Sequence, residues 1–220
     1  MLLHLSGILS AEKAAALRDL LDDPAVFADG RATAGWAARQ VKNNEQVAPG
    51  ARAETLGRTV EAALQANEVF NAYARPKAFV RTQFSRYTPG MAYGTHVDDA
   101  LMGGVRTDLS FTLFLSDPHS YSGGELVIET EAGETAVKMA PGAAVIYPTG
   151  ALHRVDPVSE GVRLAAVGWV RSYVRRADRR DILFDLDIAT RTIAETDGKN
   201  AVYDRLAKTK ANLMRMWAED

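Results

Sequence analysis

The sequence predicts a mainly β protein: a double-stranded β-helix (jelly roll) core with flanking N-terminal helices and a helical C-terminal region. Strand-like alternation runs from about residue 79 to 173, glycine-bearing turn signals separate its short segments, and helix-like periodicity lies on either side. About eight strands joined by hairpin turns favour two packed sheets over alternating strand and helix units. We expect a jelly-roll domain with its N-terminal helices over residues 1–174, and a helical region packed on or beside it over 175–220.

Composition narrows the class of protein. The 220 residues are 47% hydrophobic and include no cysteine, so disulfides, thiolate metal sites and a cysteine nucleophile are excluded. Any metal must therefore be bound by His, Asp or Glu, and the chain has only four histidines. Lys plus Arg at 26 against Asp plus Glu at 28 gives no positive field for nucleic acid or anionic lipid. No apolar run reaches the roughly 18 residues of a membrane span, and no leader pattern is present, so we expect a cytoplasmic protein.

Each end of the chain has helical signals. The first residues suggest a strand, after which Ser10 can cap a helix over residues 11–22. A second helix is expected over 54–71, where apolar side chains recur every three or four positions. After residue 175 two further helices are expected, the second from about Asn200.

Strands fill the middle of the chain. A long strand over residues 105–115 alternates Leu109, Phe111 and Leu113 with Ser110 and Thr112. The other expected strands cover residues 79–87, 92–97, 125–130, 135–139, 143–147, 153–158 and 163–173. Turn pairs such as Pro89-Gly90 and Gly123-Gly124 separate them.

His96 and Asp98 are the first candidate metal ligands. Positions i and i+2 of a strand point to the same side, so both side chains can hold one ion, whereas Asp99 points away. His153 opens a later strand of the same jelly roll and is the candidate third ligand. Two His and one carboxylate leave coordination positions open, an arrangement typical of non-haem Fe(II) oxygenases.

Arg163 is the candidate anion-binding residue. Alternation places it on the otherwise apolar face of Ala165 and Val167, where a guanidinium needs an anionic partner. A dicarboxylate with one end on the metal and the other on Arg163 would meet that need. The alternative is an internal salt bridge, for example to Asp108 or Asp156.

These residues carry a resemblance to a known family. The order His96-x-Asp98, His153 and then Arg163 resembles the iron- and 2-oxoglutarate-dependent dioxygenases. The stretches RYTPG at 86–90, LFLS at 113–116 and GGELVI at 123–128 resemble their prolyl 4-hydroxylase branch. The segment YGTHVD at 93–98 and the tail beginning RRDIL at 179–183 are most similar to the PKHD-type hydroxylases, over nearly the whole chain.

The resemblance implies an activity and its cofactors. It implies a dioxygenase that uses Fe(2+), 2-oxoglutarate and dioxygen, hydroxylates a small-molecule, peptidyl or amino-acid-like substrate and releases succinate. His96, Asp98 and His153 would bind iron, Arg163 would bind 2-oxoglutarate, and Tyr87 would reach the cosubstrate carboxylate. L-ascorbate would keep the iron ferrous. Halogenating relatives replace the carboxylate ligand by a small residue, so Asp98 favours hydroxylation.

Two other functions remain open from the sequence. A non-catalytic, cupin-like protein could use the same ligands to bind zinc, manganese or a small ligand, with Arg163 paired internally. An interaction module built on the C-terminal helices would explain their apolar stripes but not the site, and these helices also allow a homodimer. We expect Trp169 in the core and no role for His4 or His119. The irregular, glycine-bearing segments at residues 31–51 and 99–107 are candidate lid segments.

Overall fold

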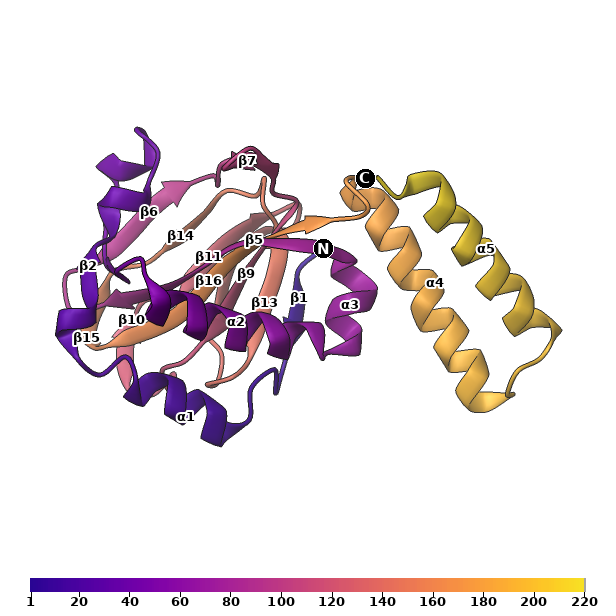
Figure 1. The fold of residues 1–220 in the computed structure, drawn as a ribbon, viewed down its shortest axis with the longest axis horizontal. Coiled ribbons are helices and arrows are strands. Elements are labelled where there is room, and N and C mark those ends of the chain that lie inside the picture. The colour runs from indigo at the N-terminus through magenta and orange to yellow at the C-terminus, as the bar shows by residue number, and fades with distance from the viewer. Residues whose placement is uncertain (220) are drawn as a thin grey trace.

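The computed structural model describes residues 1–219 and shows two antiparallel sheets with helices on one side (Figure 1). The larger sheet has the order β1 (Leu3–Leu5), β13 (Ala144–Pro148), β9 (Leu109–Phe114), β16 (Arg163–Ser172), β5 (Pro76–Tyr87), β4 (Glu45–Val47) and β2 (Phe27–Asp29). The smaller has the order β12 (Gly133–Val137), β11 (Leu126–Thr130), β14 (His153–Val155), β6 (Ala92–His96) and β3 (Lys42–Asn43). Two short pairs complete the strands: β10 (Tyr121–Gly123) with β15 (Val158–Gly161), and β7 (Leu101–Met102) with β8 (Val105–Arg106).

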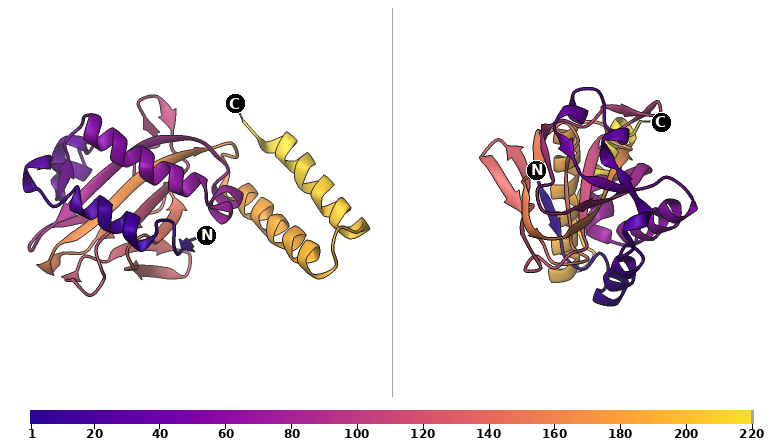
Figure 2. Two further views of the ribbon diagram at one scale, coloured as in Figure 1. Left: turned by 60° about the horizontal axis from the view of Figure 1, so that its bottom comes forward. Right: turned by 90° about the vertical axis from the view of Figure 1, so that its left-hand side faces the viewer.

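Helices cover the outer face of the larger sheet (Figure 2). They are α1 (Ala11–Asp19), α2 (Ala51–Gln65) and α3 (Glu68–Ala74), and short 3-10 turns lie at Pro24–Val26, Gly30–Thr33 and Ala38–Gln40. Leu17, Val60 and Phe70 from these helices share one buried apolar cluster with Phe111 and Leu113 of β9. Burial of these side chains holds the sheet in place under the helices.

Strand β9 is buried along its whole length, because the helices cover one of its faces and the smaller sheet lies across the other. Leu109 and Phe111 belong to the apolar cluster under the helices, whereas Ser110 and Thr112 line a cavity between the sheets. The polar positions of the alternation therefore face a cavity rather than bulk solvent.

The structure corrects two predicted elements. The helix expected over 54–71 is two helices, because Asn67 leaves the helical conformation and its Oδ1 accepts a hydrogen bond from the Phe70 amide at 2.8 Å. The strand expected over 105–115 is also two, since β8 pairs with β7 while β9 pairs with β13 and β16. Ser10 caps α1 as predicted, although that helix ends at Asp19.

The segment over residues 31–51 is more ordered than expected. It contributes β3 to the smaller sheet and β4 to the larger sheet, so it connects the two. Gln46 lies opposite Ser85 of β5, and its Nε2 donates to the side chains of Gln83 and Ser85. The segment is thus part of the cavity wall.

The C-terminal region is a helical hairpin of α4 (Ala177–Thr196) and α5 (Ala201–Trp217) that projects from one end of the sheets (Figure 1). Its base is fixed by the edge contact of Tyr73 with Phe184 and by the ion pair of Arg75 with Asp187. Lys210 of α5 also pairs with Asp187, which ties the two helices together. Among the helices of residues 1–219, none has the length and apolarity required to cross a bilayer.

Candidate active site

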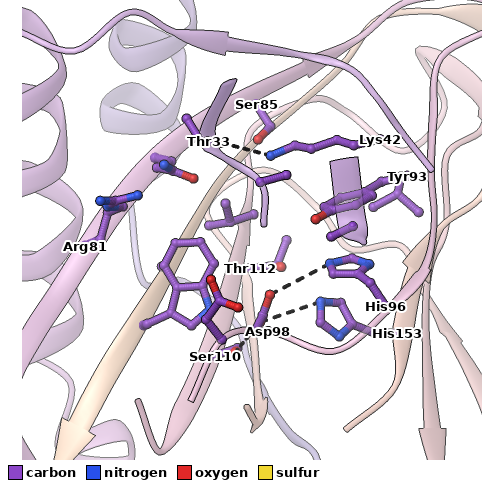
Figure 3. Close-up of a pocket in the computed structure, with 18 of the residues that line it drawn as sticks. Thr33, Lys42, Arg81, Ser85, Tyr93, His96, Asp98, Ser110, Thr112 and His153 are labelled. Atoms are coloured by element: carbon purple, nitrogen blue, oxygen red, sulfur yellow. Dashed lines mark hydrogen bonds and ion pairs between the residues drawn. The ribbon is translucent and has the colours of Figure 1, made fainter. Parts of the chain in front are cut away.

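Two paired strands bring together side chains that are far apart in the sequence. His96 ends β6, His153 begins β14, and the two are direct register partners in the smaller sheet. Asp98 follows β6 two residues later and turns toward both rings (Figure 3). The candidate ligand atoms of the three residues all lie within 4.8 Å of one another, so they can hold one metal ion.

Asp98 contacts both imidazoles. Its Oδ1 lies 3.7 Å from His96 Nε2, and its Oδ2 lies 3.7 Å from His153 Nε2. Because the two rings are only 4.2 Å apart between centroids, both Nε2 atoms and the carboxylate face the same small volume. That geometry matches one face of a metal coordination sphere.

Backbone carbonyls fix the tautomer of each histidine. His96 Nδ1 lies 2.9 Å from the Gly94 oxygen, and His153 Nδ1 lies 3.0 Å from the Ala151 oxygen. A carbonyl oxygen only accepts, so each Nδ1 carries the proton and each Nε2 presents its lone pair. Second contacts of this kind orient metal-binding histidines.

The surroundings keep His96 neutral and Asp98 oriented. Burial, reinforced by His153, lowers the pKa of His96 to about 4. The ring of Tyr93 stacks on His96 with centroids 3.6 Å apart, while the Ser110 hydroxyl donates to Asp98 Oδ2 at 2.8 Å. The rings and the carboxylate are therefore held in place before any ligand binds.

Arg163 lies at the start of β16, opposite Tyr87 of β5. It is only 1% exposed, and its guanidinium carbon lies 5.1 Å from the Tyr87 ring centroid. Among residues 1–219, none provides a hydrogen-bond partner for its three guanidinium nitrogens. A buried, permanently charged group in this state requires an anion, because desolvation without compensation is strongly unfavourable.

The expected alternative partners of Arg163 are engaged elsewhere. Asp108 pairs with Arg106 at 2.8 Å and also accepts from the Ser172 amide. Asp156 pairs with Arg154 at 2.8 Å. Within residues 1–219 no internal ion pair of Arg163 is formed, which leaves the guanidinium available to a ligand.

One cavity of about 260 Å³ joins the two features. His96, Asp98 and His153 line it together with Tyr87 and Arg163. Trp169, which we expected in the core, lies on its wall because it shares the inward face of β16 with Val167. His119 is exposed in its loop, and His4 is exposed on the edge strand β1.

Sequence reasoning missed Lys42 and Ser110. Lys42 is buried in the cavity wall, and Ser110 holds the carboxylate of Asp98. Ser110 carried a signal, because it lies on the polar side of the β9 alternation. Lys42 carried none, since a single lysine in a polar segment is normally solvent-exposed.

The residues fit iron and a dicarboxylate. The two imidazole nitrogens and one carboxylate suit Fe(II) and leave positions open for other ligands. The unpartnered guanidinium in the same cavity suits the free carboxylate of a chelating 2-oxo acid.

Comparison with known proteins gives the same class. The model of the 2OG-Fe(II) oxygenase superfamily matches residues 82–171, and that of the PKHD-type hydroxylase C-terminal domain matches 178–219. A Pseudomonas putida prolyl-4-hydroxylase superposes with a TM-score of 0.58 at 22% identity, over 78% of this chain and 92% of that one. The carbocyclase SnoK of nogalamycin biosynthesis gives a TM-score of 0.59 at 13% identity, over 80% and 82%. These neighbours confirm the jelly-roll fold. The matched model places residues 82–171 among the 2OG-Fe(II) oxygenases, a superfamily that uses iron(II) and 2-oxoglutarate.

Full-length relatives define the family within that superfamily. The PKHD-type hydroxylase of Maricaulis maris is 55% identical over 220 residues, and that of Parvibaculum lavamentivorans is 50% identical over 220 residues. Both alignments cover the whole of each chain. The chain therefore belongs to the PKHD-type hydroxylases, as the sequence motifs predicted.

Proposed function

We propose that this hydroxylase binds Fe(2+) through His96, Asp98 and His153 and binds the distal carboxylate of 2-oxoglutarate through Arg163, with Tyr87 beside it. The observation that carries the proposal is the unpartnered guanidinium in the cavity of the His-Asp-His cluster. When bound, iron and 2-oxoglutarate supply oxidation of a substrate C–H bond by dioxygen, coupled to decarboxylation to succinate.

The chain supplies orientation and charge. The two Nε2 atoms and Asp98 fix the metal on one side of the cavity, and the Gly94 and Ala151 carbonyls fix the rings. Arg163 neutralises one carboxylate of the cosubstrate, and the apolar side chain of Val167 lines the same cavity. The non-catalytic, cupin-like alternative required Arg163 to be paired internally, and its nitrogens have no such partner.

The substrate we propose is amino-acid-like or peptidyl. The prolyl hydroxylase relationship of the fold supports this class, although a fold alone does not define what enters the cavity. L-ascorbate is the proposed reductant that keeps the iron ferrous, which the family resemblance supports. Omission of ascorbate should shorten the linear phase of succinate formation, and an unchanged time course would remove it from the proposal.

A homodimer through the C-terminal hairpin is a further part of the proposal. Ile182 and Ile188 of α4 and Val202 and Met216 of α5 are each about half exposed or more. Sedimentation equilibrium tests this, because a monomer at micromolar concentration would contradict it. The cytoplasmic location and the division of the chain at residue 174 stay predictions from the sequence.

Anaerobic visible spectroscopy tests the proposed site directly. Addition of Fe(II) and 2-oxoglutarate to the folded apoprotein should produce the weak charge-transfer band of a chelated complex. Iron without 2-oxoglutarate is the control and should give no band. A folded protein that shows no band with both ligands would overturn the proposal.

A further inference from the structure

Three charged side chains on the cavity wall have no part in the proposed site. Iron(II), 2-oxoglutarate, Asp98 and Arg163 together carry no net formal charge. The remaining charged residues of the wall are Lys42, Arg81 and Asp99, which leave one excess positive charge. A cavity with an uncompensated charge favours a ligand of the opposite sign.

Lys42 is the unusual member of this group. It comes from β3, is 6% exposed, and its Nζ donates to Thr33 Oγ1 at 3.0 Å. The ammonium also lies 5.0 Å from the centroid of the Tyr93 ring, but within residues 1–219 it forms no ion pair with a carboxylate. Such a buried cation ordinarily has an anionic partner.

The two carboxylates that interact electrostatically with Lys42 have other partners. Asp98 belongs to the metal cluster, and Asp29 forms a bidentate pair with Arg31. Burial lowers the pKa of Lys42 to about 8, a shift that Asp98 and Asp29 only partly oppose. The side chain therefore remains charged at neutral pH without a dedicated partner.

Arg81 stands where two cavities meet. It comes from β5 opposite Trp169, and it lines both the metal cavity and a neighbouring cavity of about 590 Å³. Thr33, the hydroxyl bound by Lys42, lines both cavities as well, and Figure 3 shows it between Lys42 and Arg81. The positive charge of Arg81 contributes to the lowered pKa of Lys42, so the two cations repel each other across this wall.

A neutral donor on the wall of this cavity lacks an acceptor. The indole Nε1 of Trp169 is buried and makes no hydrogen bond. Lys42 and Arg81 bring cationic N–H groups to this cavity, and Trp169 adds a buried N–H that has no acceptor among residues 1–219. Two cations and an unpartnered N–H on one wall favour a ligand with anionic oxygens.

We propose that the substrate carries an anionic oxygen group, in its simplest form a carboxylate, that binds between Lys42 and Arg81 while the C–H bond to be oxidised faces the His-Asp-His cluster. This inference rests on the proposed function, because 2-oxoglutarate must occupy Arg163 for Lys42 to select a second anion. The neighbouring cavity gives the rest of the substrate room beyond Arg81.

A structural role for Lys42 makes the opposite prediction. Thr33 Oγ1 donates to Gln46 Oε1, and Gln46 Nε2 donates to Gln83, so Lys42 could serve only to fix this chain of hydrogen bonds. In that case the cavity would not distinguish an acid from its neutral amide.

The test is calorimetric binding to the anaerobic Fe(II)·2-oxoglutarate complex. The probes are N-acetylglycine, N-acetyl-L-proline and N-acetyl-L-leucine, each compared with its primary carboxamide. We expect at least one acid to bind about tenfold more tightly than its amide, as charge-assisted hydrogen bonds provide. Lys42→Met should remove this preference by weakening the acid alone, and Lys42→Arg should restore most of it.

Arg81→Gln repeats the test at an exposed position, where misfolding is not a concern. It should weaken the acid severalfold and leave the amide unchanged, whereas Arg52→Gln, an exposed cation of α2 outside both cavities, should change neither. Equal affinity of acid and amide, no binding by any acid, or a preference that survives Lys42→Met would overturn the inference. Loss of the charge-transfer band before any probe is added would instead overturn the proposed function.

Discussion

Two regions of the molecule each bury an arginine to the same extent, but only one of them supplies it with hydrogen-bond acceptors. Arg163 in the jelly roll and Arg180 at the base of the C-terminal hairpin are both 1% exposed. Arg180 Nη1 donates to the carbonyls of Val174 and Arg175 at 2.8 and 2.7 Å. The guanidinium of Arg163 makes no hydrogen bond to any residue that the structure describes.

The difference separates a structural charge from a ligand-binding charge. At the hairpin base the protein itself supplies acceptors for Arg180 Nη1, although Arg180 Nε has no partner among residues 1–219, and Asp187 is shared between Arg75 and Lys210. In the cavity no residue among 1–219 partners Arg163, and we propose that a ligand does. Burial alone identifies neither role, whereas the state of the hydrogen-bonding partners distinguishes them.

Removal of the carboxylate at the metal cluster should have the largest effect. Asp98→Ala should reduce succinate formation to the background of the assay, because two histidines alone hold the metal weakly. The melting temperature should remain within a few degrees of wild type, since the apolar cluster under the helices is untouched. Asp99→Ala is the matched control and should retain the charge-transfer band that appears with Fe(II) and 2-oxoglutarate. Full turnover by Asp98→Ala would contradict the assignment.

Arg163→Met tests whether the buried arginine of the cavity binds a ligand rather than stabilising the fold. Loss of two charge-assisted hydrogen bonds should raise the 2-oxoglutarate concentration for half-saturation by about 100-fold or more. The apoprotein should be at least as stable as wild type in urea, because an unpaired buried charge is replaced by an apolar chain of similar length. Binding of the metal alone should not change. An equal loss of metal and 2-oxoglutarate affinity would indicate a structural arginine instead.

Arg180→Met should show the converse behaviour. The buried Val174 carbonyl and the partly buried Arg175 carbonyl lose their donor, so the free energy of unfolding should fall by about 1 to 3 kcal/mol in a urea titration. Affinity for 2-oxoglutarate in the folded protein should equal that of wild type, because the side chain is remote from the cavity lining. Arg175→Met, an exposed neighbour, is the control and should alter neither quantity. A stable Arg180→Met protein would remove the distinction between the two arginines.

Local pattern was sufficient to predict most of the fold and the principal candidate residues. Strand alternation predicted that His96 and Asp98 share one side, and they do meet, although β6 ends at His96 and Asp98 lies two residues beyond it. The alternation around Arg163 predicted an inward-facing side chain, and Arg163 lines the cavity. Their meeting with His153 was an expectation from the strand order, and the register of β6 with β14 produces it.

Features that depend on long-range contacts could not be predicted in this way. Nothing in the sequence distinguishes Arg163 from Arg180 in hydrogen-bonding capacity. Only the folded positions of the Val174 and Arg175 carbonyls give Arg180 its hydrogen-bond acceptors. The burial of Lys42 likewise depends on the pairing of β3 with β6. The break at Asn67 depends on a competition between helix propagation and capping, which a periodic pattern does not resolve.

The smallest predicted effect concerns the support of the metal cluster. Ser110 touches the carboxylate of Asp98 and not the metal position, so Ser110→Ala should weaken metal binding by about tenfold rather than abolish it. The released Oδ2 also lies 3.7 Å from His153 Nε2, and a freely rotating carboxylate would lose that alignment. Equilibrium titration with Fe(II) under anaerobic conditions measures the change, and Thr112→Val on the same face of β9 is the control. At saturating iron the 2-oxoglutarate requirement of Ser110→Ala should match wild type, because Arg163 holds the other end of the cosubstrate. A raised requirement at saturating iron would mean that the two ends of the cavity are coupled through β9 and are not independent anchors.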